Sequence, residues 1–557
     1  MKISTLFCRA TLLMVLTVAL VFNNANGQVP NDSIVADFND FVRILEETHP
    51  DPYTNYGGRP FFRKAAMETR FGLIQDKVTD VREFAWRINE FLAPLKDGHT
   101  MAMPDGPFVP GHFPINYTAP STQILLETIN DGIIVKALPD EYKNLVGSRL
   151  IAIENVPIKE LADKMSKYFI AENETGRMMN LAHYAMQPIA LRKAVAGIGE
   201  TSITYQLKTA KGKKAELTLP IVPYNQVLNW QQKTQSPSVF PGKQLDYDFM
   251  GMLQYGHLDE GKNTMYFHVA HMVARDILDR YRENGYDCSE LLGAIYGMVG
   301  MPVPGNQDMA IAMIPSLSEE FEKMLQLMKQ NGSKNLIVDL RGNGGGYTQI
   351  CYPLVYQLYG DEYLKVKDNL DDGEGGFLIT PQLVSNNRLE QWNTERDCNY
   401  QYGDYIQYSP KEPHSIVSET MRNAFINGST CSIKDKLKGQ QGQPVYLPEH
   451  VYVLTDPTTF SAAFHFAYYL WKMGATIVGV PSSQAPNTYM GQLPFTLKRT
   501  GLEGEIDMTI QKFFPDNDPR AKEFTPDMMP TYEDYKRYNF DDNTIPLYLM
   551  DIINKKK

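Results

Sequence analysis

One short segment constrains the architecture of this chain more than any other: Leu336-Ile-Val-Asp-Leu-Arg-Gly-Asn-Gly-Gly-Gly346. Its apolar residues and acid predict a short buried strand, which then breaks into a turn that holds four glycines. Glycine tolerates positive φ and lets another segment or a ligand approach the backbone closely. Consecutive N–H groups in such a turn can form an anion-binding concavity. By itself, the segment is compatible with an ordinary strand-to-helix turn or with a binding site.

A second segment shows the same pattern farther along the chain. The apolar run Val451–Leu454 leads into Thr455-Asp-Pro-Thr-Thr-Phe-Ser-Ala-Ala-Phe-His-Phe-Ala-Tyr-Tyr-Leu470, which predicts a strand, a polar turn and an Ala- and aromatic-rich helix. Ser461 falls at the start of that helix, where a serine most often serves as an N-cap. The alternative is a nucleophile whose tetrahedral intermediate is stabilised by the N–H of Ala462 and by the glycine turn.

A third segment, Leu95-Lys-Asp-Gly-His-Thr100, supplies a candidate base. It closes a stretch, Val81–Leu95, that has helical periodicity. A lone histidine is more often structural or surface-exposed. Serine catalysis, however, needs a base that titrates near neutral pH, and histidine is the usual choice. His99 is therefore the candidate base.

The set LKDGHT, LIVDLRGNGGG and TTFSAA resembles, in order and approximate spacing, the tail-specific and tricorn-type serine peptidases. This family includes the carboxyl-terminal processing proteases. The resemblance extends from about Asn31 to about Asp534. It implies an α/β protein that hydrolyses peptide bonds, with a crotonase-like (ClpP/crotonase) catalytic domain.

Site residues follow from the resemblance position by position. Ser461 matches the nucleophile and His99 matches the base of the tricorn branch. The oxyanion hole is implied to consist of the N–H of Ala462 and an N–H from Gly344 or Gly345. Attack on a carbonyl would follow acyl-transfer logic, with the base taking the serine proton and returning it to the leaving amine.

The other branch of the family uses a lysine base beyond the serine, where this chain reads Gln484-Ala-Pro-Asn-Thr-Tyr489. The nearest lysine, Lys498, lies in a strand-like run, so Ser–His chemistry is favoured. The acid that would orient the histidine is predicted to be Glu523, which precedes the pair Pro526-Asp527. Two other acids remain possible, Glu503 and Glu505.

Four further positions bear on the resemblance. Gly98 stands where the tricorn branch carries a serine, and Phe464 stands where the family carries an acid. The Phe464 substitution would alter either helix packing or the substrate groove. Asp339 and Arg341 are expected to form a buried structural pair.

The first 27 residues predict a signal peptide, because a basic start is followed by an apolar stretch and small residues near Gly27. We therefore expect export to the periplasm or the extracellular space, with no membrane span after signal removal. A net charge of −11 does not suggest nucleic acid as a partner. Four cysteines follow the signal, and Cys398–Cys431 is the preferred disulfide. No CxxC or HExxH spacing is present, so neither a metal nor another cofactor is expected.

The chain is long enough for several domains. We expect a helical N-terminal region carrying the His99 motif, a β-rich PDZ-like module, a polar linker and an α/β catalytic domain with a long insertion. Their expected ranges are 28–111, 112–224, 225–261, 262–557 and, for the insertion, about 361–447.

Two function classes follow. The first is an exported serine peptidase that acts on peptides or proteins by Ser–His acyl-enzyme chemistry. The second is a noncatalytic peptide- or glycan-binding protein on the same scaffold. An esterase-type acyl hydrolase would share the chemistry of the first class.

Overall fold

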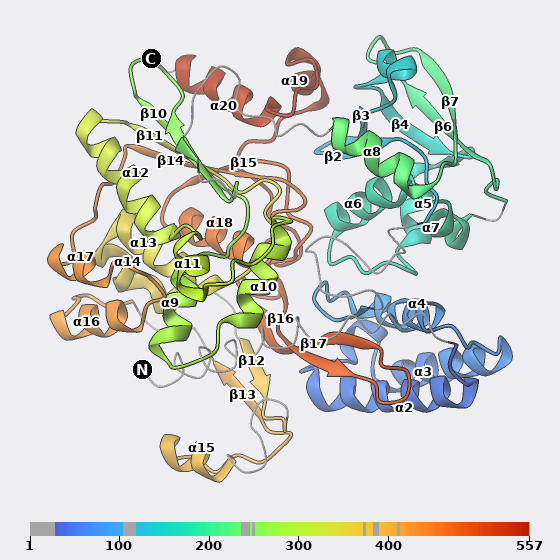
Figure 1. Cartoon of the computed structure of the whole chain (residues 1–557), viewed down its shortest axis with the longest axis horizontal. Coiled ribbons are helices and arrows are strands. Elements are labelled where there is room, and N and C mark those ends of the chain that lie inside the picture. The colour runs from blue at the N-terminus through green and yellow to red at the C-terminus, as the bar shows by residue number, and fades with distance from the viewer. Residues whose placement is uncertain are drawn as a thin grey trace.

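The computed structural model describes residues 28–103, 119–195, 197–234, 246–247, 251–370, 375–381, 389–408 and 413–555. The predicted signal peptide, residues 1–27, lies outside these ranges. The described chain is a mixed α/β protein with three sheets. In Figure 1 the central sheet and its helices lie on the left, a smaller β-rich unit on the upper right and a helical unit on the lower right. The expected α/β class is confirmed.

The helical unit forms from strongly amphipathic segments. Apolar side chains of its helices share a core that also takes in Phe495 and Ile506 from a distant hairpin. The side chain of Asp80 caps α4 by accepting from the N–H of Glu83. The elements are α2 (Asn31–Thr48), η1 (Thr54–Tyr56), α3 (Arg59–Gln75), α4 (Val81–Leu92) and η2 (Ala93–Leu95), followed by β1 (Met101–Met103).

The β-rich unit is an antiparallel sheet in the order β2-β3-β4-β6-β7, with β5 paired to β4. Its strands alternate buried and more exposed residues, as expected for a sheet covered on one face. Its elements are β2 (Leu125–Ile129), β3 (Gly132–Ala137), η3 (Asp140–Leu145), β4 (Arg149–Ile153), β5 (Val156–Pro157), α5 (Ile158–Met165), α6 (Glu174–Tyr184), α7 (Pro188–Ala194), β6 (Ser202–Lys208), β7 (Lys214–Pro220) and α8 (Tyr224–Thr234).

The central sheet has the order β15-β14-β11-β10-β9-β8. Strands β10 (Thr264–Val269), β11 (Asn335–Asp339), β14 (His450–Thr455) and β15 (Thr476–Gly479) are parallel neighbours. The two strands predicted before the glycine turn and before Ser461 are present as β11 and β14. The range 225–261, expected to be a linker, instead contains α8, β8 (Asp246–Tyr247) and β9 (Leu253–His257). Since β9 pairs with β10, part of this range belongs to the central sheet.

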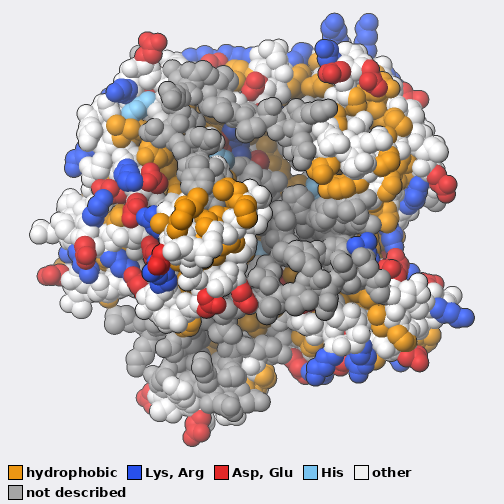
Figure 2. All heavy atoms as spheres, viewed as in Figure 1, with side chains coloured by type: hydrophobic (Ala, Val, Ile, Leu, Met, Phe, Trp, Pro, Cys, Tyr) orange, Lys and Arg blue, Asp and Glu red, His pale blue; other side chains and the backbone are white. Residues whose placement is uncertain are grey.

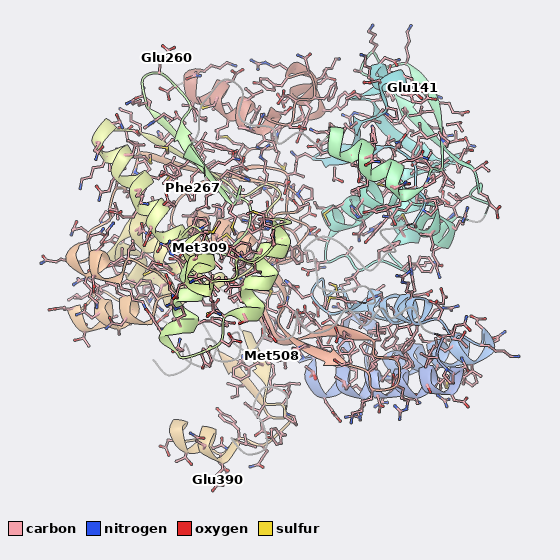
Figure 3. All side chains as sticks on the ribbon, viewed as in Figure 1. Glu141, Glu260, Phe267, Met309, Glu390 and Met508 are labelled. Atoms are coloured by element: carbon pink, nitrogen blue, oxygen red, sulfur yellow. The ribbon has the colours of Figure 1, made fainter. Side chains whose placement is uncertain are left out.

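Helices cover both faces of the central sheet. On one face, the ring of Phe267 packs 5.1 Å from that of Phe321 (Figure 3). This core includes α9 (Arg275–Glu283), α10 (Ser289–Met298), α11 (Gln307–Ala312), α12 (Leu317–Asn331), η4 (Thr348–Ile350), α13 (Cys351–Tyr359) and α18 (Ala462–Lys472). Ala521 of η6 (Pro519–Ala521) joins the same core. On the other face, α19 (Tyr532–Arg537) and α20 (Thr544–Lys555) fill a separate core.

The third sheet links the central sheet to the helical unit. Its order is β1-β17-β12-β13, and β16 pairs with β17. The hairpin of β16 (Asn487–Thr496) and β17 (Glu503–Lys512) reaches from the central unit to α2 (Figure 1). The expected insertion has structure of its own: α14 (Asp361–Val366), η5 (Lys367–Asn369), β12 (Gly375–Leu378), α15 (Leu389–Arg396), β13 (Tyr405–Tyr408), α16 (Glu419–Gly428) and α17 (Lys434–Gly439).

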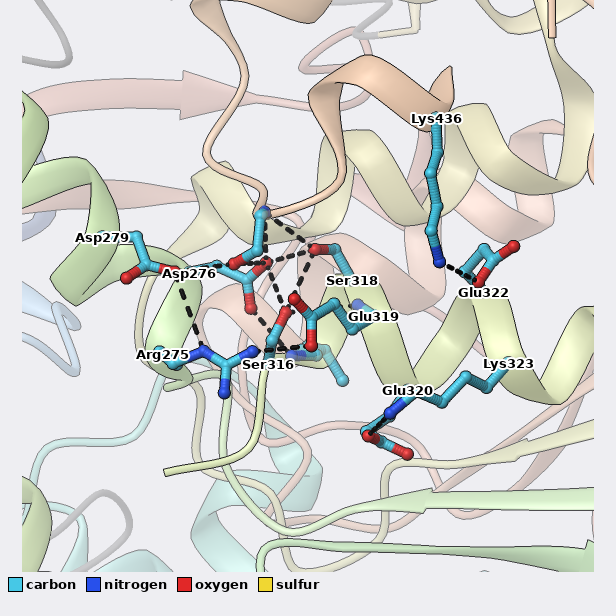
Figure 4. A network of polar contacts seen from close by, with 12 residues as sticks. Arg275, Asp276, Asp279, Ser316, Ser318, Glu319, Glu320, Glu322, Lys323 and Lys436 are labelled. Atoms are coloured by element: carbon cyan, nitrogen blue, oxygen red, sulfur yellow. Dashed lines mark hydrogen bonds and ion pairs between the residues drawn. The ribbon is translucent and has the colours of Figure 1, made fainter. Parts of the chain in front are cut away.

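A buried acid fastens the end of the insertion to the core. The carboxylate of Asp276 accepts hydrogen bonds from the N–H of Leu317 (2.7 Å), the hydroxyl of Ser316 (3.1 Å), the hydroxyl of Ser318 and the N–H of Ser432 (3.1 Å) (Figure 4). The first three donors form the start of α12, where negative charge is favourable. Burial raises the pKa of Asp276, so these donors are needed to keep its charge in the interior.

The predicted Cys398–Cys431 disulfide is wrong. The four described cysteines are free thiols. Cys431 lies in the main core, whereas Cys398 packs on the small cluster around Phe377 in the insertion. The two cysteines are close in sequence, but they pack in different hydrophobic cores.

Apolar side chains gather on the surface over α10 and α11 (Figure 2). Met298, Val303 and Met309 are 45%, 44% and 57% exposed there. Within the described ranges, every helix is too short or too polar to serve as a transmembrane span.

We predict that Asp276→Ala will lower the free energy of unfolding by about 2–4 kcal/mol, because several buried donors lose a charged acceptor. A lower urea midpoint with unchanged circular dichroism of the folded state is the expected result. The control is Asp308→Ala, since the Asp308 side chain is 80% exposed and pairs only at the surface with Arg282. Equal midpoints for the two variants would contradict the role of Asp276.

Candidate active site

The glycine turn and the Ser461 turn meet because their strands are parallel neighbours. Asp339 of β11 is in register with Leu454 of β14, so both strands end at the same edge of the sheet. Two hydrogen bonds then join the turns: the N–H of Phe460 donates to the carbonyl of Asn343 (3.0 Å), and the N–H of Gly342 donates to Asp456 (3.1 Å). Ligand sites in parallel sheets characteristically form at this edge.

Ser461 has a strained backbone, with φ 52° and ψ −126°. Positive φ is uncommon outside glycine and costs roughly 1–3 kcal/mol, and such residues cluster at functional sites. The hydroxyl makes no capping hydrogen bond to α18. The ordinary N-cap interpretation therefore does not account for this serine.

Gly345 packs directly against the candidate nucleophile. It has φ +107°, and a Cβ placed on it would lie 2.6 Å from the Cβ of Ser461 and 2.9 Å from the N of Ala462. Only glycine fits in this position. The N–H of Gly345 already donates to the side-chain oxygen of Asn343 (2.9 Å). Within the described chain, the N–H groups of Gly344 and Ala462 have no such partner and remain available as donors.

His99 reaches this edge from the helical unit. Strand β1 pairs antiparallel with β17, with Met101 opposite Glu505, and continuing this register places His99 opposite Asp507. The N–H of Asp507 donates to the hydroxyl oxygen of Thr100 (2.9 Å), which holds the pairing beyond β1. The His99 ring lies 4.9 Å from the ring of Phe460, the residue before Ser461. The structure thus brings the histidine and serine segments together.

His99 is buried, and neither ring nitrogen has a hydrogen-bond partner among the described residues. Burial lowers the pKa of His99 to about 4, although the charge of Asp97 acts in the opposite direction. The imidazole is therefore neutral at pH 7. Its Nδ1 lies 3.6 Å from Oδ2 of Asp507, slightly farther apart than in a hydrogen bond.

Several carboxyl groups lie around His99, and their pKa values are shifted in different directions. Burial, together with the charge of Asp97, raises the pKa of Asp507 well above its ordinary value. Burial would also raise the pKa of Asp97, but the hydrogen bond and the electrostatic attraction of His49 lower this pKa to about 2. Asp97 therefore carries the charge and Asp507 the proton, and the approach of Asp507 to His99 joins two neutral groups. Burial raises the pKa of Glu505 to about 7.

Glu523 lies against the β-rich unit. Its carboxylate accepts from the N–H (3.1 Å) and the hydroxyl (3.0 Å) of Thr175. Among the described acids, Asp507 approaches the His99 ring, and no such contact with Glu523 is present. Sequence reasoning missed Asp507, although it lies on the same strand and face as the candidates Glu503 and Glu505.

A second buried histidine was also missed. His465 lies one helical turn after Ser461, and its Nδ1 is 2.9 Å from the hydroxyl of Thr348. Burial, followed by the proximity of His99, lowers its pKa to about 3. The sequence signal for this residue is its spacing: a histidine four residues after a serine at a helix start lies on the same face of the helix.

Glu172 explains why residue 98 is glycine. Its carboxylate accepts from the N–H of Gly98 (2.9 Å) and the N–H of Ala485 (2.8 Å). A Cβ at Gly98 would lie 2.7 Å from that carboxylate and 2.9 Å from the Phe460 ring. The serine of the tricorn branch has no room here. A small pocket is lined by Gly98, Glu172 and Phe460, together with Met179.

Three side chains, including that of His99, have atoms that could ligate a metal ion. In the described chain, donor atoms of Asp97, His99 and Glu172 lie within 4.8 Å of one another. However, Asp97 already accepts from the N–H of His99 (3.0 Å), and Glu172 accepts two backbone N–H groups. A metal would have to compete with these bonds, and we assign none.

Two other positions have structural roles. Arg341 pairs with the buried carboxylate of Asp339 at 2.7 Å, and the Tyr266 hydroxyl donates to the same group (2.6 Å). The expected structural pair is present, with Asp339 buried and Arg341 partly buried. Phe464 is buried in α18, and its ring stacks on that of Phe513, 6.0 Å away. Its effect is therefore on helix packing.

Residues 308–529 match the model of peptidase family S41. This segment therefore carries the features of peptidase family S41, a match that supports a serine-type peptidase. No curated protein matches it. Among solved structures, mature CPAF has 13% identity and a TM-score of 0.49, with 88% of this chain and 94% of that chain covered. The photosystem II D1 C-terminal processing protease has 12% identity and a TM-score of 0.35, with 90% and 94% covered.

We predict that Gly98→Ser will reduce activity instead of restoring a missing group. The side chain would push against Glu172 and Phe460 and displace His99, with a cost of about 1–3 kcal/mol in stability and at least about tenfold in turnover. The measurement is thermal unfolding together with peptide turnover. Gly293→Ser is the control, because a Cβ there meets nothing within 4 Å. Parental turnover in Gly98→Ser would contradict the steric explanation.

Proposed function

We propose that the protein is an exported serine peptidase in which Ser461 attacks the peptide carbonyl and His99 accepts its proton. The observation that carries this proposal is the strained Ser461 at the start of α18, with a hydroxyl that caps nothing and Gly345 in contact with its side chain. A nucleophile held on a sharp strand-to-helix turn is typical of acyl-transfer enzymes. The N–H groups of Ala462 and Gly344 are the favoured oxyanion donors, because the N–H of Gly345 is already engaged.

The electrostatics support His99 as a general base. Because burial lowers its pKa to about 4, the ring is neutral and can take a proton at pH 7. The imidazolium formed in this way needs a nearby negative charge. Asp97 and Asp507 together hold one, and Asp507 faces Nδ1. We therefore favour Asp507 over Glu523 as the orienting acid, and expect the 3.6 Å approach to shorten in the substrate complex.

The remaining parts have assigned roles in the proposal. The central sheet would be the crotonase-like catalytic domain, and the β2–β7 sheet would be the PDZ-like module. Such modules bind peptides by adding a strand to a sheet edge. Glu172 and Thr175 connect this unit to the catalytic segments. Export to the periplasm or extracellular space, with cleavage near Gly27, rests on the N-terminal sequence alone.

The first test is hydrolysis of a diverse peptide pool by residues 28–557. We expect Ser461→Ala and His99→Ala each to lower turnover by at least about 10³-fold, because the triad residues act as a unit. Exposed Ser289→Ala and His450→Ala are matched controls and should behave like the parent.

The outcomes distinguish the alternatives. Cleavage that survives His99→Ala would refute the base assignment and return Lys498 to consideration. Absence of cleavage by the folded parent would favour a noncatalytic binding protein or a non-peptide ester substrate.

The second test concerns the acid and the pH dependence. His99 is active when neutral, so kcat/KM should rise with pH through a midpoint near 4 and stay level to neutral pH. We expect Asp507→Ala to lower kcat about 100-fold, since the imidazolium loses its neighbour, and Glu523→Ala to change kcat less than about threefold. A midpoint near 6.5, or the reverse order of the two variants, would refute this assignment.

A further inference from the structure

We propose that Gln484 is a positioning residue for the nucleophile and that its amide nitrogen is a hydrogen-bond donor for the peptide substrate. The inference rests on the proposed function and deepens it. The N–H of Ser461 donates to Oε1 of Gln484 at 2.5 Å. Because a backbone N–H needs an acceptor, this contact fixes which end of the amide faces the serine.

The backbone of Gln484 is tied to the same turn that carries Ser461. The hydroxyl of Ser482 donates to the carbonyl of Thr459 (2.6 Å) and accepts from the N–H of Gln484 (2.9 Å). The N–H of Ser483 donates to the carbonyl of Pro457 (3.0 Å). Gln484 therefore moves with the turn and holds the serine from a fixed position.

This support matters because Ser461 is strained. Without Oε1, the partly buried N–H of Ser461 would lose its acceptor, and the positive φ would relax. A displacement of about 1 Å at a reacting atom can cost about 100-fold in rate. The contact also occupies the N–H of Ser461, which leaves Ala462 and Gly344 as the oxyanion donors.

The other end of the amide is unused. Nε2 of Gln484 is buried and has no partner among the described residues, and the whole side chain is 0% exposed. An unpaired buried donor is unfavourable, so it persists where a ligand group completes it. A peptide carbonyl is the matching acceptor. Gln484 lies in the segment where the lysine branch carries its base, but a neutral amide cannot abstract a proton.

Three variants test the proposal. Gln484→Met keeps the size and removes both polar groups, whereas Gln484→Glu keeps an oxygen acceptor for Ser461. Gln357→Met makes the same change at another fully buried glutamine, on α13, which bonds to Ser318. The readouts are the rate at which a fluorophosphonate labels Ser461, kcat and KM for a cleaved peptide, and thermal unfolding.

We expect Gln484→Met to fold and to lose about 100-fold in labelling rate and in kcat. Gln484→Glu should recover labelling to within about threefold of the parent, while its KM stays raised because the N–H donor is gone. Gln357→Met should match the parent in both rates.

Failure of this inference differs from failure of the proposed function. A folded Gln484→Met that labels at the parental rate, or a Gln484→Glu that recovers nothing, would overturn the role of Gln484 while Ser461 remains the nucleophile. A parent that is neither labelled nor cleaves peptides would overturn both.

Discussion

The parallel pairing of β11 with β14 is the constraint on which the rest of the site depends. It brings the ends of two strands, more than a hundred residues apart in the chain, to one edge of the sheet. Phe460 and Asn343 then join their turns, and Gly345 lies against Ser461 with no space for a side chain. A shift of one residue in this register would turn every side chain of the strand to the other face and separate Ser461, the proposed nucleophile, from the glycine turn.

The pairing of β1 with β17 imposes a second constraint, with electrostatic consequences. It places His99 and Asp507 in a buried region that also holds Asp97, with Glu505 partly buried beside them. Few charges can be kept there, so most of these groups are neutral. Glu172, from the β-rich unit, closes the same region by accepting from Gly98 and Ala485. Three parts of the chain therefore meet at one group of buried polar side chains.

Some departures from the family pattern have local steric causes. The space of a side chain at residue 98 is taken by Glu172 and Phe460, and Phe464 completes an aromatic core with Phe513. The disulfide prediction failed for a related reason, since proximity in sequence gave no information on which core each cysteine would join. In the range 225–261, the polar composition predicted a linker, but strand β9 forms there because its backbone pairs with β10 of the central sheet.

The sequence by itself determined the local features: the strands around the glycine turn and Ser461, the amphipathic helix α4 before His99 and the buried Asp339–Arg341 pair. These depend on side-chain periodicity, glycine content and short separations, which can be seen directly in a single chain. Only the tertiary structure decided that Asp507 faces His99, that Glu523 bonds Thr175 and that Gln484 holds Ser461. Those contacts depend on strand register and on burial, which arise when distant segments pack together and which no local pattern encodes.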